Sequence, residues 1–352
     1  MRHKRKIRLA IGASGTGSCL EAVIKAHQTS IYDFEPVVAF TEKTGCKAME
    51  KADAAGIPVV EVEIPEYDPD NSLVGITQQE KEFLQKLDEA HGDSYPFGRK
   101  KLLRKGLHEL RLVPKIMKYD PDFIVLLGYV PILSPYMVGF YKNKILNTHP
   151  APLEFQGLHG YSWAVGNHPK IGNPNGRNKW TCVTFHFVDE MLDHGPIIAQ
   201  TPLEVRANTT EKSLARRGLP LEHAQIIQCL QYLATDRIIL NNGFAEVLSE
   251  RGEPYSDHIW LSQLIPDEWD KIHVKVKFEK GKFTYIIFGP EGLEVRNTTI
   301  DEVIPPNLMF TYTYRHVNEL RSKGVEVDFN YLGLNIHPVG MCPKEEQNGR
   351  RS

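Results

Sequence analysis

The chain has 352 residues, and its 42 Lys and Arg nearly balance its 44 Asp and Glu, for a formal charge of −2. This balance gives no overall field that would attract nucleic acid or a membrane surface. The five cysteines are widely spaced and contain no Cys-x-x-Cys pair, so neither a zinc site nor a disulfide framework is indicated. We therefore expect small-molecule partners, no metal, no nucleic acid, no membrane and a reducing, cytoplasmic location.

Up to residue 248, short β-rich runs alternate with helical segments, which is typical of a mostly parallel sheet with helices on both faces. The pattern predicts an α/β, Rossmann-like domain over residues 1–248. The expected strands, in chain order, are Ile7–Gly12, Pro36–Phe40, Val59–Val62, Phe123–Leu127, Lys144–Leu146 and Val183–Val188. The expected helices are Cys19–His27, Cys46–Ala55, the amphipathic Gln78–Glu89, Lys100–Lys118, Tyr161–Val165 and Glu211–Ala234.

The character of the sequence changes after residue 248. Two alternating runs, His273–Glu279 and Lys282–Phe288, are joined through Lys280-Gly281 and predict a β-hairpin, with a further short run at Leu293–Arg296. We expect residues 249–352 to form a small β-rich extension. Its role is open between a dimer contact and a lid.

Small residues fill the turn Ala13–Leu20, between the first expected strand and helix. Backbone N–H groups can approach an anion closely at such a helix start, where the helix dipole also favours negative charge. Gly15 and Gly17 are present, but the third glycine of a dinucleotide fingerprint and the Lys-Ser/Thr of a nucleotide P-loop are absent. The turn is therefore either a phosphate cradle or a tight structural turn.

An amide and an imidazole follow the expected strand Lys144–Leu146. Asn147 and His149 stand where this strand leaves the sheet, and Pro150 prevents further pairing. An amide can hold a carbonyl oxygen and a histidine can shuttle a proton. A nearby carboxylate such as Asp193 can orient that histidine and raise its pKa. Together these residues predict acyl-group transfer.

Four segments also carry a family resemblance in their order and spacing: Ser14–Ser18, Asp53–Val59, Asp120–Pro135 and Asn147–Gln200. Over residues 7–240 the chain resembles the folate-dependent formyltransferases. Within them it is similar to the branch that formylates a glycinamide amine, in purine biosynthesis, using 10-formyltetrahydrofolate as co-substrate.

The resemblance implies a role for each matching residue. It implies that Asn147 holds the formyl oxygen, that His149 as an imidazolium stabilises the oxyanion and transfers protons, and that Asp193 keeps His149 charged. The other matching positions are Gly17, Ser18 and Cys19 for the substrate phosphate, Glu222 for the glycinamide, Lys105, Val130, Pro131, Ile132, Leu133, Asn147, Asp189 and Asp193 for the folate, and His159 near the site.

Other interpretations remain open for several residues. Without the resemblance, Glu222 reads as part of a solvated helix face, His186 as a structural strand residue and His159 as a hydrogen-bonded loop residue. The basic run Arg99–Lys105 is more typical of the polar face of a helix than of an anion site.

Other functions remain open as well. The acceptor could instead be a nucleotide-linked amino sugar or methionyl-tRNA, the formyl donor could be hydrolysed, or the chain could bind folate without turnover. The basic insertion at residues 168–179 and the C-terminal extension have no counterpart in the short members of the family. A homodimer is compatible with the sequence.

Overall fold

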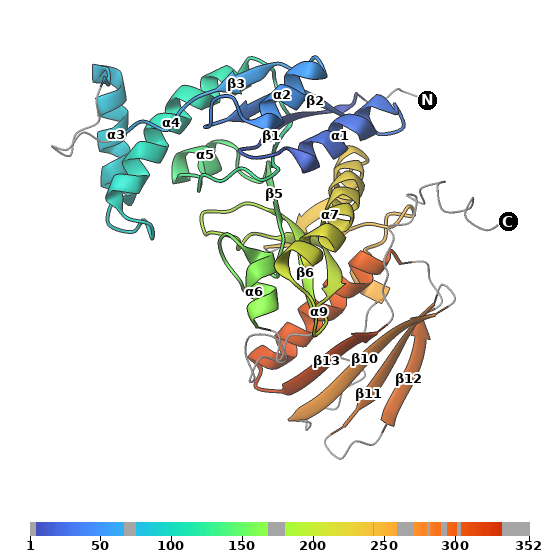
Figure 1. Ribbon diagram of the computed structural model, residues 1–352. Coiled ribbons are helices and arrows are strands. Elements are labelled where there is room, and N and C mark those ends of the chain that lie inside the picture. Colours follow the sequence, from blue (N-terminus) through green and yellow to red (C-terminus); the bar gives the residue numbers. More distant parts are fainter. Residues whose placement is uncertain are drawn as a thin grey trace.

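The computed structural model describes residues 5–66, 75–167, 180–241, 243–258, 270–279, 282–289, 294–300 and 304–332. Its central feature is a seven-stranded sheet (Figure 1). The strands are β1 (Ile7–Gly12), β2 (Phe34–Thr41), β3 (Val59–Glu61), β4 (Phe123–Leu126), β5 (Ile145–His149), β6 (Trp180–Phe187) and β7 (Ile197–Glu204). Their order across the sheet is β3-β2-β1-β4-β5-β6-β7, which confirms the predicted α/β class.

The first five strands pair in parallel, whereas β6 runs antiparallel to β5, and β7 antiparallel to β6. Parallel strands covered on both faces need apolar residues on both faces, and Leu9, Ala10 and Ile11 of β1 are all fully buried. The carboxyl ends of β1, β4 and β5 meet at one edge of the sheet. Loops that follow these three strands are therefore brought together there.

Seven helices accompany this sheet among the described residues up to 234. Six lie close to the ranges that the sequence predicts, and the short helix at Pro135–Phe140 was not predicted. They are α1 (Ser18–Gln28), α2 (Lys47–Ala54), α3 (Gln78–His91), α4 (Arg99–Met117), α5 (Pro135–Phe140), α6 (Gly160–Gly166) and α7 (Glu211–Ala234). Helix α3 begins with a capping box, in which Thr77 and Glu80 bond each other's backbone N–H. It packs on α4 through Leu84 and Leu87, as its amphipathic pattern predicts.

After α7 the chain forms a hairpin and a second sheet, which we call the C-terminal part (residues 238–332). The hairpin is β8 (Ile238–Asn241) with β9 (Phe244–Val247). The second sheet has the order β12-β11-β10-β13, made of β10 (Lys271–Glu279), β11 (Lys282–Phe288), β12 (Glu294–Ile300) and β13 (Glu326–Leu332). The predicted hairpin is confirmed, because β10 and β11 pair antiparallel with His273 opposite Phe288.

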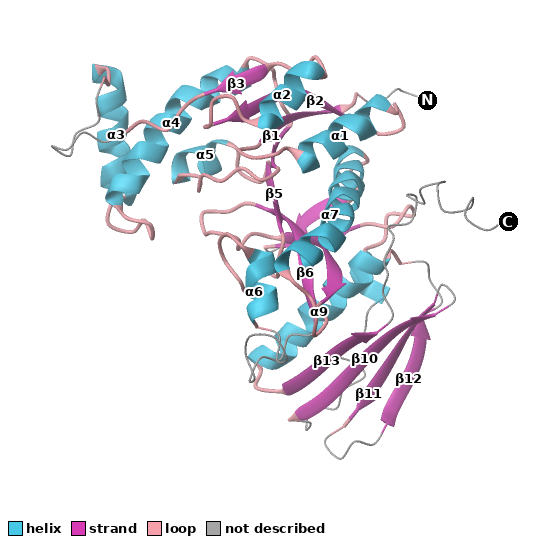
Figure 2. Ribbon diagram, viewed as in Figure 1, coloured by secondary structure: helices cyan, strands magenta, loops and turns pink. Residues whose placement is uncertain are grey.

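Helix α9 (Pro306–Ser322) was not predicted, and neither were β8, β9 and β13. The helix lies between the two sheets (Figure 2). Its centre, Phe310–Tyr314, is a run of aromatic residues and threonines that by itself favours a strand. Burial outweighs that preference here, since all five side chains are buried. Helix propensity differs by less than about 1 kcal/mol among such residues, so packing decides.

Helix α9 joins the two sheets through one continuous hydrophobic core. The Trp180 ring of β6 meets Phe310 and Tyr314 of α9 edge-on, at centroid distances of 5.2 and 4.9 Å. The division into units at residue 248 stays a prediction from the sequence. In the described ranges, every helix is too short or too polar to cross a membrane.

Candidate active site

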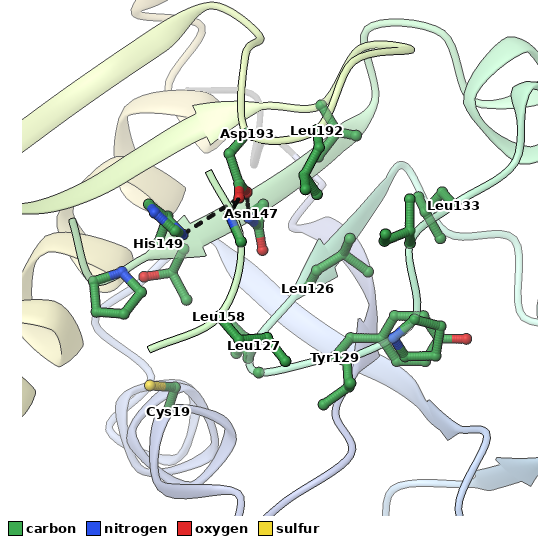
Figure 3. Close-up of a pocket in the computed structure, with 18 of the residues that line it drawn as sticks. Cys19, Leu126, Leu127, Tyr129, Leu133, Asn147, His149, Leu158, Leu192 and Asp193 are labelled. Carbon is green, nitrogen blue, oxygen red and sulfur yellow. Dashed lines mark hydrogen bonds and ion pairs between the residues drawn. The ribbon is translucent and has the colours of Figure 1, made fainter. Parts of the chain in front are cut away.

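A cavity of about 490 Å³ lies at the edge where β1, β4 and β5 end (Figure 3). It is walled by the turn after β1, the loop after β4, the end of β5 and the loop between β6 and β7. The predicted site residues that line it are Gly17, Ser18, Cys19, Val130, Pro131, Ile132, Leu133, Asn147, His149, His159, Asp189, Asp193 and Glu222.

Lys105 is the predicted residue that lies elsewhere, on helix α4 and outside the lining of this cavity. Its side chain is half-buried. Burial lowers the pKa of its ammonium to about 8, against the opposing effect of Glu109 and Glu42. A folate contact by Lys105 therefore stays a prediction from the sequence.

Asn147 and His149 project from the same face of β5, because they are two residues apart on a strand. The strand reaches His149, three residues beyond its predicted end at Leu146. It is longer because β6 pairs with it antiparallel, with Asn147 opposite His186 and His149 opposite Thr184. Both catalytic candidates are thus held by ladder hydrogen bonds and not by a loop.

The imidazole of His149 is buried between two acceptors. Nε2 donates a hydrogen bond to the Phe155 carbonyl oxygen at 2.9 Å, which leaves Nδ1 facing Asp193 Oδ2 at 3.7 Å. Burial lowers the pKa of His149, while Asp193 and the Phe155 carbonyl act in the opposite direction. The sequence led us to expect that Asp193 would raise this pKa, and that effect is present but smaller than the effect of burial. His149 therefore gives up a proton more readily than an exposed histidine.

Asp193 connects the loop between β6 and β7 to the rest of the site. Its backbone is left-handed, with φ of 45°, a conformation that aspartate tolerates better than most residues. Oδ2 accepts a hydrogen bond from the Gly157 N–H at 2.8 Å, and Oδ1 accepts one from Asn147 Nδ2 at 3.4 Å. The carboxylate is thereby fixed beside both catalytic candidates.

His186 sets the orientation of the Asn147 amide. Its Nδ1 lies 2.8 Å from the carbonyl oxygen of Phe187, which can only accept, so Nδ1 carries the hydrogen. Its Nε2 then accepts from Asn147 Nδ2 at 3.2 Å. Burial lowers the pKa of His186 to about 4, so the ring is neutral at physiological pH and stays an acceptor. One amide hydrogen of Asn147 is thus fixed, and the second is held only by the long contact to Asp193.

The interpretation of His186 as merely structural was therefore incomplete, since this side chain also lines the cavity. The alternation Phe185-His-Phe187 shows that the His186 side chain lies on the other face of the sheet from its two neighbours. It does not show which residue His186 contacts. Its partner follows from the β5–β6 register, which no local pattern in the sequence reveals.

The glycine-rich turn contributes the opposite wall. Gly17 has φ of 70° and precedes the first residue of α1, and a Cβ there would lie 2.7 Å from the Ala48 Cα. Ser14 ties the turn to the loop after β4, because its Oγ accepts from the Val130 N–H at 3.0 Å. The N–H groups of the first helical turn have no partner within the helix, so they can receive an anion.

Glu222 lies between this turn and β5. It belongs to α7, where the sequence alone suggested a solvated face, but only 7% of the residue is exposed. One carboxyl oxygen accepts from Thr148 Oγ1 at 2.8 Å, and Cys19 is its other hydrogen-bonding neighbour. Burial raises the pKa of this carboxyl. A buried carboxyl group here faces whatever ligand the turn holds.

The remaining wall is apolar. Figure 3 shows Leu126, Tyr129, Leu133 and Leu192 around one end of the cavity, away from Cys19. A flat ring system fits such a lining, and the neighbouring backbone and the loop from Asp189 supply polar groups at its border. Among the described residues, no group of three or more His, Cys, Asp or Glu side chains is placed to hold a metal ion.

A doubly covered α/β sheet that presents an amide, an imidazole and a carboxylate at its strand ends defines an acyl-transfer type of enzyme. The family model described as "Formyl transferase" matches residues 7–230 of this chain. The chain belongs to the formyl transferase family.

Known relatives agree with this assignment. Phosphoribosylglycinamide formyltransferase of Escherichia coli K12 is 26% identical over 249 residues, which cover 70% of this chain and 97% of that protein. The chloroplastic phosphoribosylglycinamide formyltransferase of Vigna unguiculata is 26% identical over 71% of this chain and 68% of its own length. The crystal structure of glycinamide ribonucleotide transformylase 1 from Symbiobacterium toebii shares the fold, with a TM-score of 0.54 and 23% identity over 69% of this chain and 95% of that one.

Proposed function

We propose that this enzyme transfers the formyl group of 10-formyltetrahydrofolate to the amine of phosphoribosylglycinamide. The observation that carries the proposal is that one cavity holds both the Asn147, His149 and Asp193 cluster and the glycine-rich turn. A phosphorylated acceptor needs an anion site at a fixed distance from the reacting carbon. The names of the relatives above point to the same acceptor.

The two ends of the cavity suit two different ligands. The backbone of Gly17, Ser18 and Cys19 would receive the acceptor phosphate, and Glu222 would hold the glycinamide. The apolar end, with the backbone of residues 130–133 and the loop from Asp189, would receive the folate ring. The reacting formyl group would then lie between them, beside β5.

The transfer itself needs charge stabilisation and one proton movement. The amine nitrogen attacks the formyl carbon, a C–N bond forms, and the carbonyl electrons move onto oxygen. The second amide hydrogen of Asn147 makes only a 3.4 Å contact to Asp193, so it is available to donate to that oxygen. The Nδ1 atom of His149 accepts a proton from the attacking amine. As the old C–N bond breaks, His149 returns a proton to the departing folate nitrogen.

Absorbance measurements of tetrahydrofolate release from 10-formyltetrahydrofolate test the proposal, with and without phosphoribosylglycinamide, and with the His149→Ala variant as control. We expect release that requires the glycinamide and that the variant lacks. Equal release without the glycinamide would instead identify a hydrolase. Binding without any release would direct the search to nucleotide-linked amino sugars as acceptors.

A cytoplasmic location stays a prediction from the sequence, and a homodimer is compatible with the sequence but is not predicted by it. The basic insertion at residues 168–179 lies outside the described residues, and so do Lys280 and Gly281 of the hairpin turn.

A further inference from the structure

The loop from Pro150 to Gly157 fixes the proton arrangement of His149. Its Phe155 carbonyl oxygen takes the Nε2 hydrogen at 2.9 Å, and the Phe155 ring stacks between His149 and Trp163. Its Gly157 N–H donates to Asp193 at 2.8 Å. Both partners that favour the charged form of His149 therefore depend on where this loop lies.

Helix α9 of the C-terminal part lies behind this loop and is hydrogen-bonded to the catalytic domain. Thr311 Oγ1 accepts from the Gln200 backbone N–H of β7 at 2.7 Å, in a fully buried contact. Asn307 Nδ2 donates to Gln228 Oε1 of α7 at 2.8 Å. The helix is thus bound to the catalytic sheet and can serve as a fixed support.

A second cavity, of about 550 Å³, separates α9 from the backs of the two catalytic loops. Its walls include Asp193 and the loop residues Leu153, Glu154 and Gln156 on one side, and Tyr314 and Asn318 on the other. A loop that borders a cavity has few packing partners on that side, so single tethers matter more.

One hydrogen bond crosses from the helix to the loop: Asn318 Nδ2 donates to Glu154 Oε1 at 2.8 Å. Arg321 Nη1 donates to Asn318 Oδ1 at 3.3 Å, and the Tyr314 hydroxyl is a further hydrogen-bonding neighbour of Asn318. The amide nitrogen is therefore the atom that faces Glu154. Glu154 immediately precedes Phe155, the residue whose carbonyl oxygen bonds His149.

We propose that Asn318 is a positioning residue for catalysis, which holds the loop of Phe155 against His149 through Glu154. The C-terminal part is then neither a separate lid nor only a dimer contact, because it supports the catalytic loop from behind. This inference rests on the proposed function, since it assigns Asn318 a part in the same reaction.

Three variants test the tether. Asn318→Asp places two carboxylates face to face and breaks the bond. Glu154→Gln keeps the bond, because its amide oxygen can still accept from Asn318. The double variant Glu154→Gln with Asn318→Asp restores one amide-to-carboxylate bond in the reverse direction, with the net charge of the wild type. Ser322→Asp, one helical turn further along α9 on the same cavity, controls for the added charge.

We expect Asn318→Asp to lower kcat about 3- to 10-fold, the loss that one exposed hydrogen bond allows. The Glu154→Gln variant, the Ser322→Asp variant and the double variant should all retain nearly full kcat, and melting temperatures check that every variant is folded. A loss that the double variant does not recover would overturn the proposal, and so would an undiminished kcat in Asn318→Asp.

A second readout needs no substrate. The NMR titration of the His149 imidazole, assigned by its absence in His149→Ala, should show a lower pKa in Asn318→Asp than in the wild type, and recovery in the double variant. An identical titration in all variants would refute the positioning role. Because this measurement is independent of the acceptor, it still decides the inference if the assay of the proposed function fails.

Discussion

Two histidines with opposite proton arrangements stand beside each other in this site. His149 carries its hydrogen on Nε2, toward Phe155, and His186 carries its hydrogen on Nδ1, toward Phe187. In each case a backbone carbonyl oxygen fixes the tautomer, since it can only accept. The result is one imidazole available for proton transfer and one that serves as a permanent acceptor for Asn147.

Asp193→Asn should lower kcat by about 100-fold or more, within the range of general acid–base contributions. The amide keeps the shape of the carboxylate but removes the charge that opposes the burial effect on the His149 pKa. Folate binding should change little. Steady-state kinetics and a fluorescence titration with folate measure the two effects, with the exposed Asp53→Asn as control. A kcat equal to that of the wild type would contradict the mechanism.

His186→Phe should lower kcat about 10- to 100-fold with little change in folate affinity, because Asn147 loses the acceptor that orients its amide. His186→Gln offers an acceptor oxygen and should recover part of the loss. Kinetics of both variants, with melting temperatures as a check on folding, would reveal the difference. Equal activity of the two variants would show that the amide does not depend on His186.

At the scale of elements, helices α4 and α5 meet at a buried carboxyl group. Glu109 of α4 is 1% exposed and accepts hydrogen bonds from both the backbone N–H, at 2.7 Å, and the hydroxyl of Ser134, which precedes α5. Burial raises the pKa of Glu109 to about 8. The loop held in this way, residues 130–133, forms part of the candidate folate wall.

This pKa gives the stability a definite pH dependence. The folded pKa lies above the unfolded value, so the folded state binds the proton more tightly. The contribution of Glu109 to the free energy of unfolding is therefore largest below about pH 4.5, and it is lost as the pH rises to about 8. Glu109→Gln has no such proton and should flatten the fall in melting temperature over that range, since the Ser134 hydroxyl can turn to accept from the new amide. Thermal melts of the wild type and of Glu109→Gln at about pH 5.5 and 8.5 measure the difference. An equal fall in melting temperature in both proteins would contradict this account.

At the scale of the whole molecule, the catalytic sheet and the C-terminal sheet share a core through α9. Phe310 is fully buried and packs against Trp180 of the catalytic sheet and Phe329 of the second sheet. The two sheets should therefore unfold together and not as independent units.

Phe310→Ala should destabilise the whole chain by about 3–5 kcal/mol, the usual cost of removing a buried phenylalanine ring. Unfolding by urea, followed both by tryptophan fluorescence and by loss of activity, should give coincident transitions at a lower midpoint. Activity that persisted after the C-terminal part had unfolded would show that the two parts are separable. The exposed Phe140→Ala provides the matched control.

The sequence by itself determined the class of fold and identified most of the residues that line the candidate site. The alternation of strands and helices requires parallel strands, and parallel strands place Gly17, Asn147 and the loop after β4 at one edge regardless of details. The hairpin β10–β11 was predictable for the same kind of reason, since strict alternation around Lys-Gly is a local signal.

The tertiary structure decided the features that depend on contacts between segments distant in the sequence. The β5–β6 register places His186 opposite Asn147, and the position of α7 buries Glu222. Packing against both sheets stabilises Phe310–Tyr314 as part of a helix. Burial of His149 lowered a pKa that its partner Asp193 would have raised. Local patterns fix how a segment alternates, but register, burial and desolvation arise between segments distant in the sequence, and only the folded chain sets them.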